Sequence, residues 1–281
     1  MRVAISDEQR QEIIRRYVAG DRPKNIAIAM GINDWNVSVI ARRAGYARSR
    51  VDAQQLILVR DEWIGNRQYT VDHRAFSTIT PDSAYWCGFL MADGNISGNK
   101  VALKLATRDV GHIEKFRTFV GANSPVRVDG PREGATINGR DIKNTGSVSI
   151  TAASSHLVKD LLALGVTPRK SLTAHAGGNV EFNVDFWRGV IDGNGSLVYS
   201  KGKPYLGLVG SGPLMTQFLA FCKTRINNEI NVRPNGNIFK VFMNCRAARI
   251  MISTLYSGCG VALERKLRKA EFILEMTKHY G

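Results

Sequence analysis

The chain has 281 residues, which is enough for one large domain or two domains, each with a core of its own. A hydrophobic content of 44% with 22% charged residues is ordinary for a folded protein and excludes a mainly disordered chain. The 39 Lys and Arg residues outnumber the 24 Asp and Glu residues, which leaves a formal net charge of +15. This excess favours a polyanionic partner, and nucleic acid comes first because bound basic residues release counterions from phosphates. A basic protein without such a partner is the alternative.

The cysteines and the apolar segments narrow the class of protein further. The four cysteines lie far apart and form no C-x-x-C pair, which argues against a zinc knuckle or a disulfide framework. The N-terminal residues turn polar early, and no segment approaches the roughly 18 apolar residues of a membrane span. We therefore expect reduced thiols, no membrane contact and an intracellular protein.

Residues 6–45 have the pattern of three short helices. Ser6 followed by Gln9 has the spacing of a capping box, Pro23 suits the first turn of a second helix, and Gly31 ends that helix. A third helix is expected from about Asp34 to Ala44. The predicted buried positions are Ile13, Ile14, Tyr17 and Val18 in the first helix, Ile26, Ala27 and Met30 in the second, and Val37, Ile40 and Ala41 in the third.

This arrangement is typical of a helix-turn-helix domain, which we place at residues 1–48. Residues 1–50 contain ten Lys or Arg and five Asp or Glu, a net charge of 10 − 5 = +5. The third helix would enter the major groove. The residues expected to reach bases are Asn33, Asp34, Trp35, Asn36 and Ser38, and those expected to reach phosphates are Arg42, Arg43, Arg48 and Arg50. A plain three-helix packing module is the alternative. Residues 49–80 are expected to form a partly helical linker.

Two segments further along the chain match each other. Residues 85–95 read YWCGFLMADGN and residues 186–196 read FWRGVIDGNGS, so that Asp93 and Asn194 correspond at an offset of 101 residues. Each copy is followed by a predicted strand (101–107 and 205–210) and a predicted helix (110–120 and 213–226). A repeat of this length is too long for a solenoid, and it indicates two pseudo-symmetric halves of one molecule.

Both copies have a helix face with very small side chains. These small residues recur every four positions: Ala84, Gly88 and Ala92 in the first copy, Gly189 and Gly193 in the second. Such faces allow two helices to pack unusually closely, which would bring Asp93 and Asn194 together at the helix ends. Oxygen ligands paired in this way could hold Mg²⁺ against a phosphodiester. The alternative is that Asp-Gly after an apolar helix is only a helix stop.

Residues 86–94 and 187–195 resemble the two copies of the LAGLIDADG motif of homing endonucleases, and residues 79–86 resemble the approach to that motif in bacterial and phage members. The resemblance covers roughly residues 70–280. It implies an α+β fold with two αββαββα repeats, placed at residues 81–178 and 179–281. It also implies two antiparallel sheets forming a saddle over double-stranded DNA, a monomer with an internal pseudo-two-fold axis, and hydrolysis with Mg²⁺ or Mn²⁺. Ca²⁺ would occupy the metal site without supporting cleavage.

The resemblance also implies roles for individual residues. Asp93 matches the metal-binding acid of the first motif, and the carbonyl groups of Ala92 and Gly193 match its backbone ligands. Lys170 and Lys266 match the basic residues near each scissile phosphate. The strand and turn residues that would contact DNA are Lys104, Arg108, Lys201, Lys203, Tyr205 and Ser211.

Asn194 departs from the family pattern, which has Asp at this position. Asn has nearly the shape of Asp but lacks its charge, so it would bind Mg²⁺ more weakly. The sequence therefore predicts a protein that binds its site but cleaves poorly or nicks one strand, through either a natural loss or a deliberate substitution. A DNA-binding regulator and an RNA intron maturase are the other functions considered. The N-terminal helices favour duplex DNA, since the major groove of A-form RNA does not admit a helix.

Overall fold

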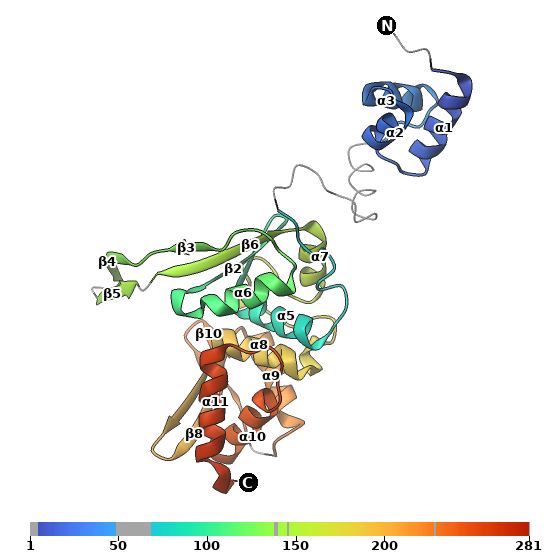
Figure 1. The fold of residues 1–281 in the computed structure, drawn as a ribbon. Helices are drawn as coiled ribbons and strands as arrows, with labels where there is room; N and C mark the ends of the chain where they lie inside the picture. The colour runs from blue at the N-terminus through green and yellow to red at the C-terminus, as the bar shows by residue number, and fades with distance from the viewer. Residues whose placement is uncertain (1–4, 49–68, 138–139, 145, 228, 281) are drawn as a thin grey trace. The chain divides into compact units, whose positions relative to one another are not determined.

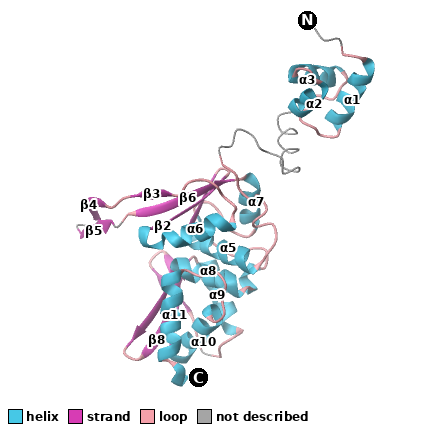
Figure 2. Cartoon of the chain, in the orientation of Figure 1, coloured by secondary structure: helices cyan, strands magenta, loops and turns pink. Residues whose placement is uncertain are grey.

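The computed structural model describes residues 5–48, 69–137, 140–144, 146–227 and 229–280, which belong to two compact units, residues 1–65 and 66–281 (Figure 1). Figure 2 shows that the first unit is helical and that the second combines helices and strands. In the described parts of the chain, none of the helices has the length and apolar character needed to cross a membrane.

The smaller unit consists of helices α1 (Asp7–Val18), α2 (Pro23–Met30) and α3 (Asp34–Arg43), as expected. Ser6 and Gln9 form the capping box of α1, and Gly31 ends α2 with a φ of 64°. The core of the unit is formed by Ile13, Tyr17, Ile26, Ala27, Val37 and Ala41. Val18 is 57% exposed, so its predicted place in the buried stripe is wrong. Ile13 and Tyr17, four residues apart, already occupy the face of α1 that is buried.

The larger unit repeats one order of elements twice. The first half contains α5 (Pro81–Asp93), β1 (Gly94–Ser97), β2 (Lys100–Ala106), α6 (Val110–Phe119), β3 (Arg127–Asp129), β6 (Ser147–Ala153) and α7 (Ser155–Ala163). The second half contains α8 (Val184–Asn194), β7 (Gly195–Ser200), β8 (Lys203–Gly210), α9 (Gly212–Lys223), β9 (Val232–Asn235), β10 (Ile238–Asn244) and α10 (Cys245–Tyr256). The αββαββα order expected for each half is confirmed.

Each half also has an addition of its own. In the first half a hairpin of β4 (Arg132–Ile137) and β5 (Arg140–Asn144) is inserted between β3 and β6, and it forms a separate two-stranded sheet. In the second half α11 (Glu264–Met276) follows α10. Short 3₁₀ helices lie at residues Thr107–Asp109 (η1), Lys170–Leu172 (η2), Val180–Phe182 (η3) and Lys278–Tyr280 (η4).

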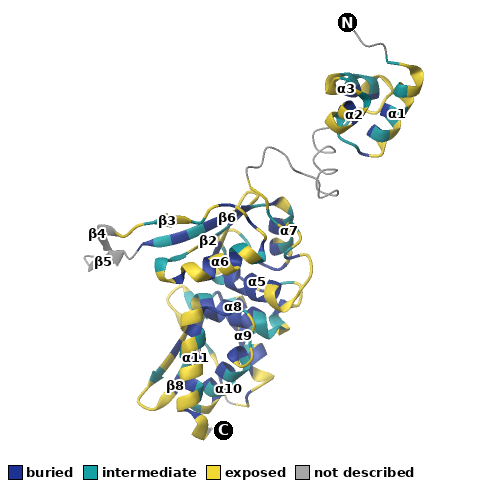
Figure 3. Cartoon of the chain, in the orientation of Figure 1, coloured by how far each residue is buried: buried dark blue, intermediate teal, exposed yellow. Residues whose placement is uncertain are grey.

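Two four-stranded antiparallel sheets carry the helices. Their strand orders are β1-β2-β6-β3 and β7-β8-β10-β9, so the two sheets have the same topology. Helices α5, α6 and α7 pack on the first sheet, and α8, α9, α10 and α11 pack on the second. Helices α5 and α8 pack against each other, and one hydrophobic core runs through both halves. Figure 3 shows the buried residues concentrated along this central helix pair.

Residues 69–80, which the sequence assigned to the linker, pack as part of the larger unit. Phe76 is 2% exposed, and its ring centroid lies 5.2 Å from that of Phe119 in an edge-to-face contact. The backbone N–H of Asp72 donates to the carbonyl of Val120 at 2.8 Å. The segment has no regular structure of its own, so its apolar anchor could be recognised only in the folded chain.

Candidate functional site

Helices α5 and α8 lie in direct backbone contact along their glycine faces. A Cβ atom at Gly88 would overlap the carbonyl oxygen of Phe186, and one at Gly189 would overlap that of Tyr85 and lie 2.7 Å from the nitrogen of Phe89. The contacts follow the same order along both helices, since residues 85 and 89 meet Gly189 and residue 92 meets Gly193. The two helices therefore run parallel and end at the same place.

Asp93 and Asn194 are the last residues of these helices. A Cβ atom at Gly193 would lie 3.4 Å from carboxylate oxygen Oδ2 of Asp93 and would overlap the methyl group of Ala92. Asp93 and Asn194 are both exposed. The juxtaposition of the two helix ends expected from the repeat is therefore present, with both polar side chains accessible to solvent.

Each helix end is bound by a lysine from its own half. The ammonium group of Lys170, at the start of η2, donates to the carbonyl of Gly94. That of Lys266, on α11, donates to the carbonyl of Gly195 at 2.7 Å and to that of Ile191 at 2.5 Å. Gly94 and Gly195 directly follow Asp93 and Asn194, so the two lysines occupy equivalent places. Lys266 is 7% exposed, whereas Lys170 is partly exposed.

The electrostatic environment matches this packing. The pKa of Asp93 is raised because the surrounding protein desolvates its carboxylate, while the positive charges of Lys266 and Lys170 act in the opposite direction. Burial lowers the pKa of Lys170 and lowers that of Lys266 to about 8, and the charge of Asp93 partly offsets both effects. The site thus combines one carboxylate with two ammonium groups in a partly desolvated place.

The oxygen atoms at the helix ends suit a hard divalent cation. They are the carboxylate of Asp93, the side-chain carbonyl of Asn194, and the main-chain carbonyls of Ala92 and Gly193, which lie in last turns, where carbonyls have no intrahelical donor. Mg²⁺ and Ca²⁺ prefer such oxygen ligands. No group of three or more His, Cys, Asp or Glu residues is arranged for a metal in the described residues. Of the two side chains at the helix ends, only that of Asp93 is a carboxylate.

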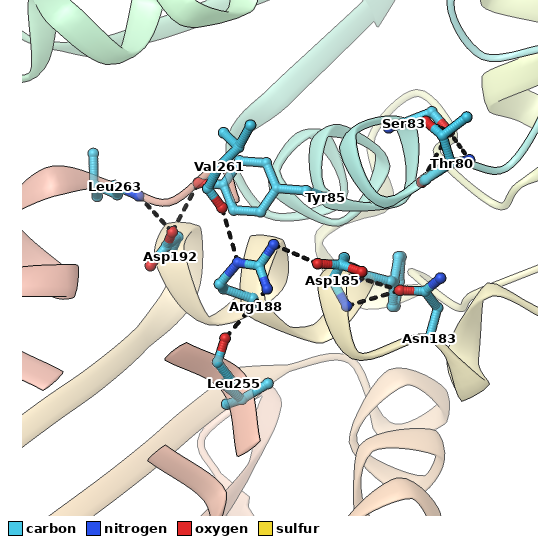
Figure 4. Close-up of polar contacts among 11 residues, drawn as sticks. Thr80, Ser83, Tyr85, Asn183, Asp185, Arg188, Asp192, Leu255, Val261 and Leu263 are labelled. Atoms are coloured by element: carbon cyan, nitrogen blue, oxygen red, sulfur yellow. Dashed lines mark hydrogen bonds and ion pairs between the residues drawn. The ribbon is translucent and has the colours of Figure 1, made fainter. Parts of the chain in front are cut away.

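The sequence analysis missed a buried polar network on α8 (Figure 4). Asp192 is fully buried and accepts hydrogen bonds from the hydroxyls of Tyr85 and Tyr256, both at 2.7 Å, and from the backbone N–H of Leu263, at the start of α11, also at 2.7 Å. Burial raises the pKa of Asp192, and these three hydrogen bonds oppose the shift. The signal was a charged residue within an apolar motif, where the other copy has Met91.

Arg188 forms the second part of this network. It is 2% exposed and donates to the carboxylate of Asp185 at 2.5 Å, to the carbonyl of Val261 at 2.8 Å and to that of Leu255 at 3.2 Å (Figure 4). These bonds fix the segment between α10 and α11, and α11 carries Lys266. The equivalent residue of the first motif is Cys87, which is buried. Its small thiol cannot donate several hydrogen bonds to distant carbonyls as the guanidinium group of Arg188 does.

The network also extends into the first half. The ring nitrogen Nε2 of His112 on α6 lies 3.0 Å from the hydroxyl oxygen of Tyr85. Because that hydroxyl donates to Asp192, it accepts from His112, which places the imidazole proton on Nε2. Burial lowers the pKa of His112 to about 3, so the ring is neutral.

The sheet residues expected to contact DNA fall into two groups. Lys104, Arg108, Lys201 and Lys203 are exposed, and Tyr205 is partly exposed. Ser211 is 1% exposed, caps the N-terminus of α9 and donates to the carbonyl of Ala174. The prediction that Ser211 contacts DNA is therefore wrong, because a serine after a strand served here as a helix cap.

The N-terminal residues are similarly divided. The side chain of Asn33 caps α3 by accepting from the backbone N–H of Trp35 at 2.9 Å. Arg48 is committed within the unit: it donates to the carbonyl of Asp21 at 3.0 Å and lies 3.9 Å from the ring centroid of Tyr17, so its predicted phosphate contact is not supported. The remaining predicted residues are exposed Asp34, Trp35, Arg42 and Arg43, partly exposed Asn36 and Ser38, and Arg50, which lies outside the described residues.

Solved structures share this fold. The homing endonuclease I-WcaI, bound to its DNA recognition sequence, matches with a TM-score of 0.50 at 11% identity, over 69% of this chain and 90% of that chain. The LAGLIDADG meganuclease I-CpaMI, bound to uncleaved DNA, matches with a TM-score of 0.44 at 12% identity, over 72% and 93%. The N-terminal LAGLIDADG domain of WhiA matches with 0.39 at 11%, over 73% and 90%. No protein-family model and no curated protein sequence matches the chain. Its larger unit has the LAGLIDADG fold.

Proposed function

We propose that the chain is a site-specific DNA endonuclease that hydrolyses a phosphodiester with Mg²⁺ or Mn²⁺ and that Asn194 limits it to nicking one strand. The observation that carries the proposal is the parallel helix pair that ends in Asp93 and Asn194, each end bound by a lysine. The net charge of +15 and the exposed lysines of the sheets favour a duplex as the substrate.

The residues of the site have different roles in this proposal. Asp93, with the carbonyls of Ala92 and Gly193, would hold the cation, which supplies Lewis acidity to the phosphate and lowers the pKa of a bound water. Lys170 is partly exposed and stands next to the carboxylate, so it can stabilise negative charge that develops on the phosphate oxygens. Lys266 is buried against two carbonyls, which makes it a positioning residue for the second helix end.

Asn194 gives the two helix ends unequal affinity for a cation. The amide oxygen can act as a ligand, but it carries no net charge, so the second end attracts a divalent cation less strongly than the first. Cleavage of both strands needs both ends. The expected product is therefore a nicked duplex.

A plasmid assay tests this function. A target duplex is first selected from a random library by binding in Ca²⁺, and a supercoiled plasmid carrying it is then incubated with Mg²⁺. The wild-type protein should nick the plasmid, Asn194→Asp should linearise it, and Asp93→Asn should be slower by at least about 100-fold, since a held metal contributes several kcal/mol. Asn231→Asp, the same change at an exposed loop position, should behave like the wild type. Equal products from the wild type and Asn194→Asp would refute the role of Asn194.

A DNA-binding protein without cleavage is the second candidate, and Asn194 is the observation that favours it. On this reading the wild type leaves the selected plasmid supercoiled in both Mg²⁺ and Mn²⁺, although it binds the duplex. Cleavage gained on Asn194→Asp alone would then identify a scaffold that lacks only the second carboxylate.

For the N-terminal unit, we propose that α3 provides a second duplex contact as the recognition helix of a helix-turn-helix domain. Trp35 is 67% exposed, and Arg42 and Arg43 are exposed near the end of the helix. Replacing both arginines by glutamine should weaken binding to all duplexes by a similar factor and should reduce its salt dependence. An unchanged salt dependence would contradict this assignment.

A further inference from the structure

The solvent faces of the two sheets differ in chemistry. Side chains alternate along a strand and paired residues share a face, so each sheet has one face toward its helices and one toward solvent. On the first sheet the solvent face is small and polar, and it includes Lys104, Ser147, Ser149, Thr151, Arg127 and Asp129. Asp129 lies 3.5 Å from the ammonium group of Lys104 and 3.0 Å from Nε of Arg127. This acid therefore offsets part of the positive charge on the first face.

The solvent face of the second sheet carries an apolar patch instead, formed by Val198 on β7, Tyr205 on β8 and Phe242 on β10. Val198 pairs directly with Tyr205, and the rings of Tyr205 and Phe242 are stacked with centroids 5.7 Å apart and an interplanar angle of 27°. Phe242 is 52% exposed and Val198 44% exposed. Gly207 faces Phe242 across the ladder, and a Cβ atom there would already be in contact with the ring at 3.4 Å. The three side chains thus form one continuous surface across three strands.

Positive charge surrounds this patch. Lys203, Lys240 and Arg233 lie on the same face and are exposed, and Lys240 and Arg233 are paired with each other. The four strands of the sheet contain no Asp or Glu. Stacked aromatic rings set among lysine and arginine side chains, on strands without an acidic residue, suit a polyanion that also offers apolar groups. In the major groove the apolar group is the C5-methyl of thymine.

We propose that the Val198–Tyr205–Phe242 patch reads thymine methyl groups in one half of the target duplex, whereas the first sheet reads its half through polar side chains. The inference rests on the proposed function, because it takes a duplex on the sheets as given. The half-site bound by the second sheet should therefore contain thymines at the positions that face the patch. The inference also predicts that the two half-sites are recognised by different chemistry despite the pseudo-symmetry.

Replacement of thymine by uracil provides the test. Duplexes are selected from a random library with the wild-type chain in Ca²⁺, and each deoxythymidine of the selected target is then replaced in turn by deoxyuridine, which removes the methyl group and leaves the hydrogen bonds unchanged. Affinity should fall about fourfold for each methyl group that the patch contacts. Substitution elsewhere should have no effect.

Variants assign the effect to the patch. Phe242→Ala should bind thymine and uracil duplexes equally at the affected positions, and selection with this variant should lose the thymine preference in one half-site only. Phe272→Ala is the matched control, because Phe272 is 47% exposed on α11 and is not part of this face. It should retain the full sensitivity to uracil. Thermal unfolding of both variants confirms that the comparison is made between folded proteins.

The outcomes separate this inference from the proposed function. Tight binding of a selected duplex without sensitivity to uracil overturns the reading of thymine methyl groups and leaves the nuclease proposal standing. Failure to select any duplex overturns both. If Phe242→Ala instead converts a dimer in sedimentation into a monomer, the patch is an interface between copies of the chain and the inference is wrong.

Discussion

The two central helices have the same backbone environment and different polar chemistry. Both use glycine at the crossing, both end at a polar residue followed by glycine, and both have the glycine carbonyl bound by a lysine. At two other motif positions α5 has Cys87 and Met91, where α8 has Arg188 and Asp192. Symmetry is therefore retained where backbones meet. It is lost beside the crossing, where Asp192 also binds Tyr85 of the first half, and at the ends of the two helices.

This difference explains how the second helix can end in an amide, where the first ends in a carboxylate, within the same backbone arrangement. The position of Asn194 depends on the helix crossing and on Lys266, which binds main-chain carbonyls. Neither contact requires a charged side chain at position 194. The buried network of Asp192 and Arg188 then stabilises α10, α11 and the segment between them around the second site. We infer that in this chain the geometry of the site is maintained separately from its chemistry.

The largest effect is expected where the two halves are alike. Gly189→Ala places a methyl group into the backbone of Tyr85 and Phe89, so the helices must separate and the free energy of unfolding should fall by about 3 kcal/mol or more. Urea unfolding measures this loss. Gly111→Ala is the control: Gly111 lies within α6 with no atom near its Cβ position, and alanine there should leave stability unchanged or raise it by up to about 1 kcal/mol. Equal effects of both substitutions would show that the helix contact is looser than described.

A smaller effect is expected where the halves differ. Asp192→Asn leaves one acceptor oxygen for three buried donors and should destabilise the protein by about 2 kcal/mol. Met91→Leu, at the equivalent position of the first motif, keeps its volume and apolar character and should cost less than about 1.5 kcal/mol. Chemical unfolding of both variants gives the comparison. An Asp192→Asn protein as stable as the wild type would mean that the network contributes only specificity.

The last effect depends on pH and concerns the link from the network to the first half. Burial lowers the pKa of His112 from its ordinary value of 6.5 to about 3 in the folded chain. Between pH 6.5 and 3 the imidazole of His112 is therefore protonated in the unfolded chain and neutral in the folded chain. The contribution of His112 to stability is therefore present above pH 6.5 and is lost as the pH falls toward 3, by roughly 1.4 kcal/mol per pH unit. The free energy of unfolding of His112→Gln, measured against pH, should lack this contribution. The difference between the wild-type and variant profiles should therefore show the slope.

The control for this profile is His175→Gln, since His175 is exposed and forms its hydrogen bond within its own loop. It should leave the wild-type slope unchanged between pH 6.5 and 4. Parallel profiles for the wild type and His112→Gln would contradict the buried neutral imidazole.

Much of the fold was predictable because its signals are local. The capping box at Ser6, the glycine after α2 and the repeated motif all act through near neighbours in the chain, and the structure confirms the elements that they predict. The glycine faces are also local patterns. They predicted the close helix pair because only small residues permit that approach.

The errors came from residues whose partners are distant. Ser211 and Arg48 are residue types that commonly contact nucleic acid. Ser211 instead donates to the carbonyl of Ala174, 37 residues away, and Arg48 donates to that of Asp21, 27 residues away. Residues 69–80 lack regular structure, so the burial of Phe76 against α6 could not be read from their composition.

The sequence by itself determined the repeat, the order of elements, the close helix pair and the unequal residues at its end, because periodicity and small side chains act along one helix or one strand. Only the tertiary structure decided that Lys266 is buried, that Asp192 connects α8 to α11, and that Tyr205 and Phe242 stack on one face. These contacts depend on the register of strands and the docking of helices that are 37 to 107 residues apart in the chain. No local pattern encodes such a distance, since it is set by how the whole core packs.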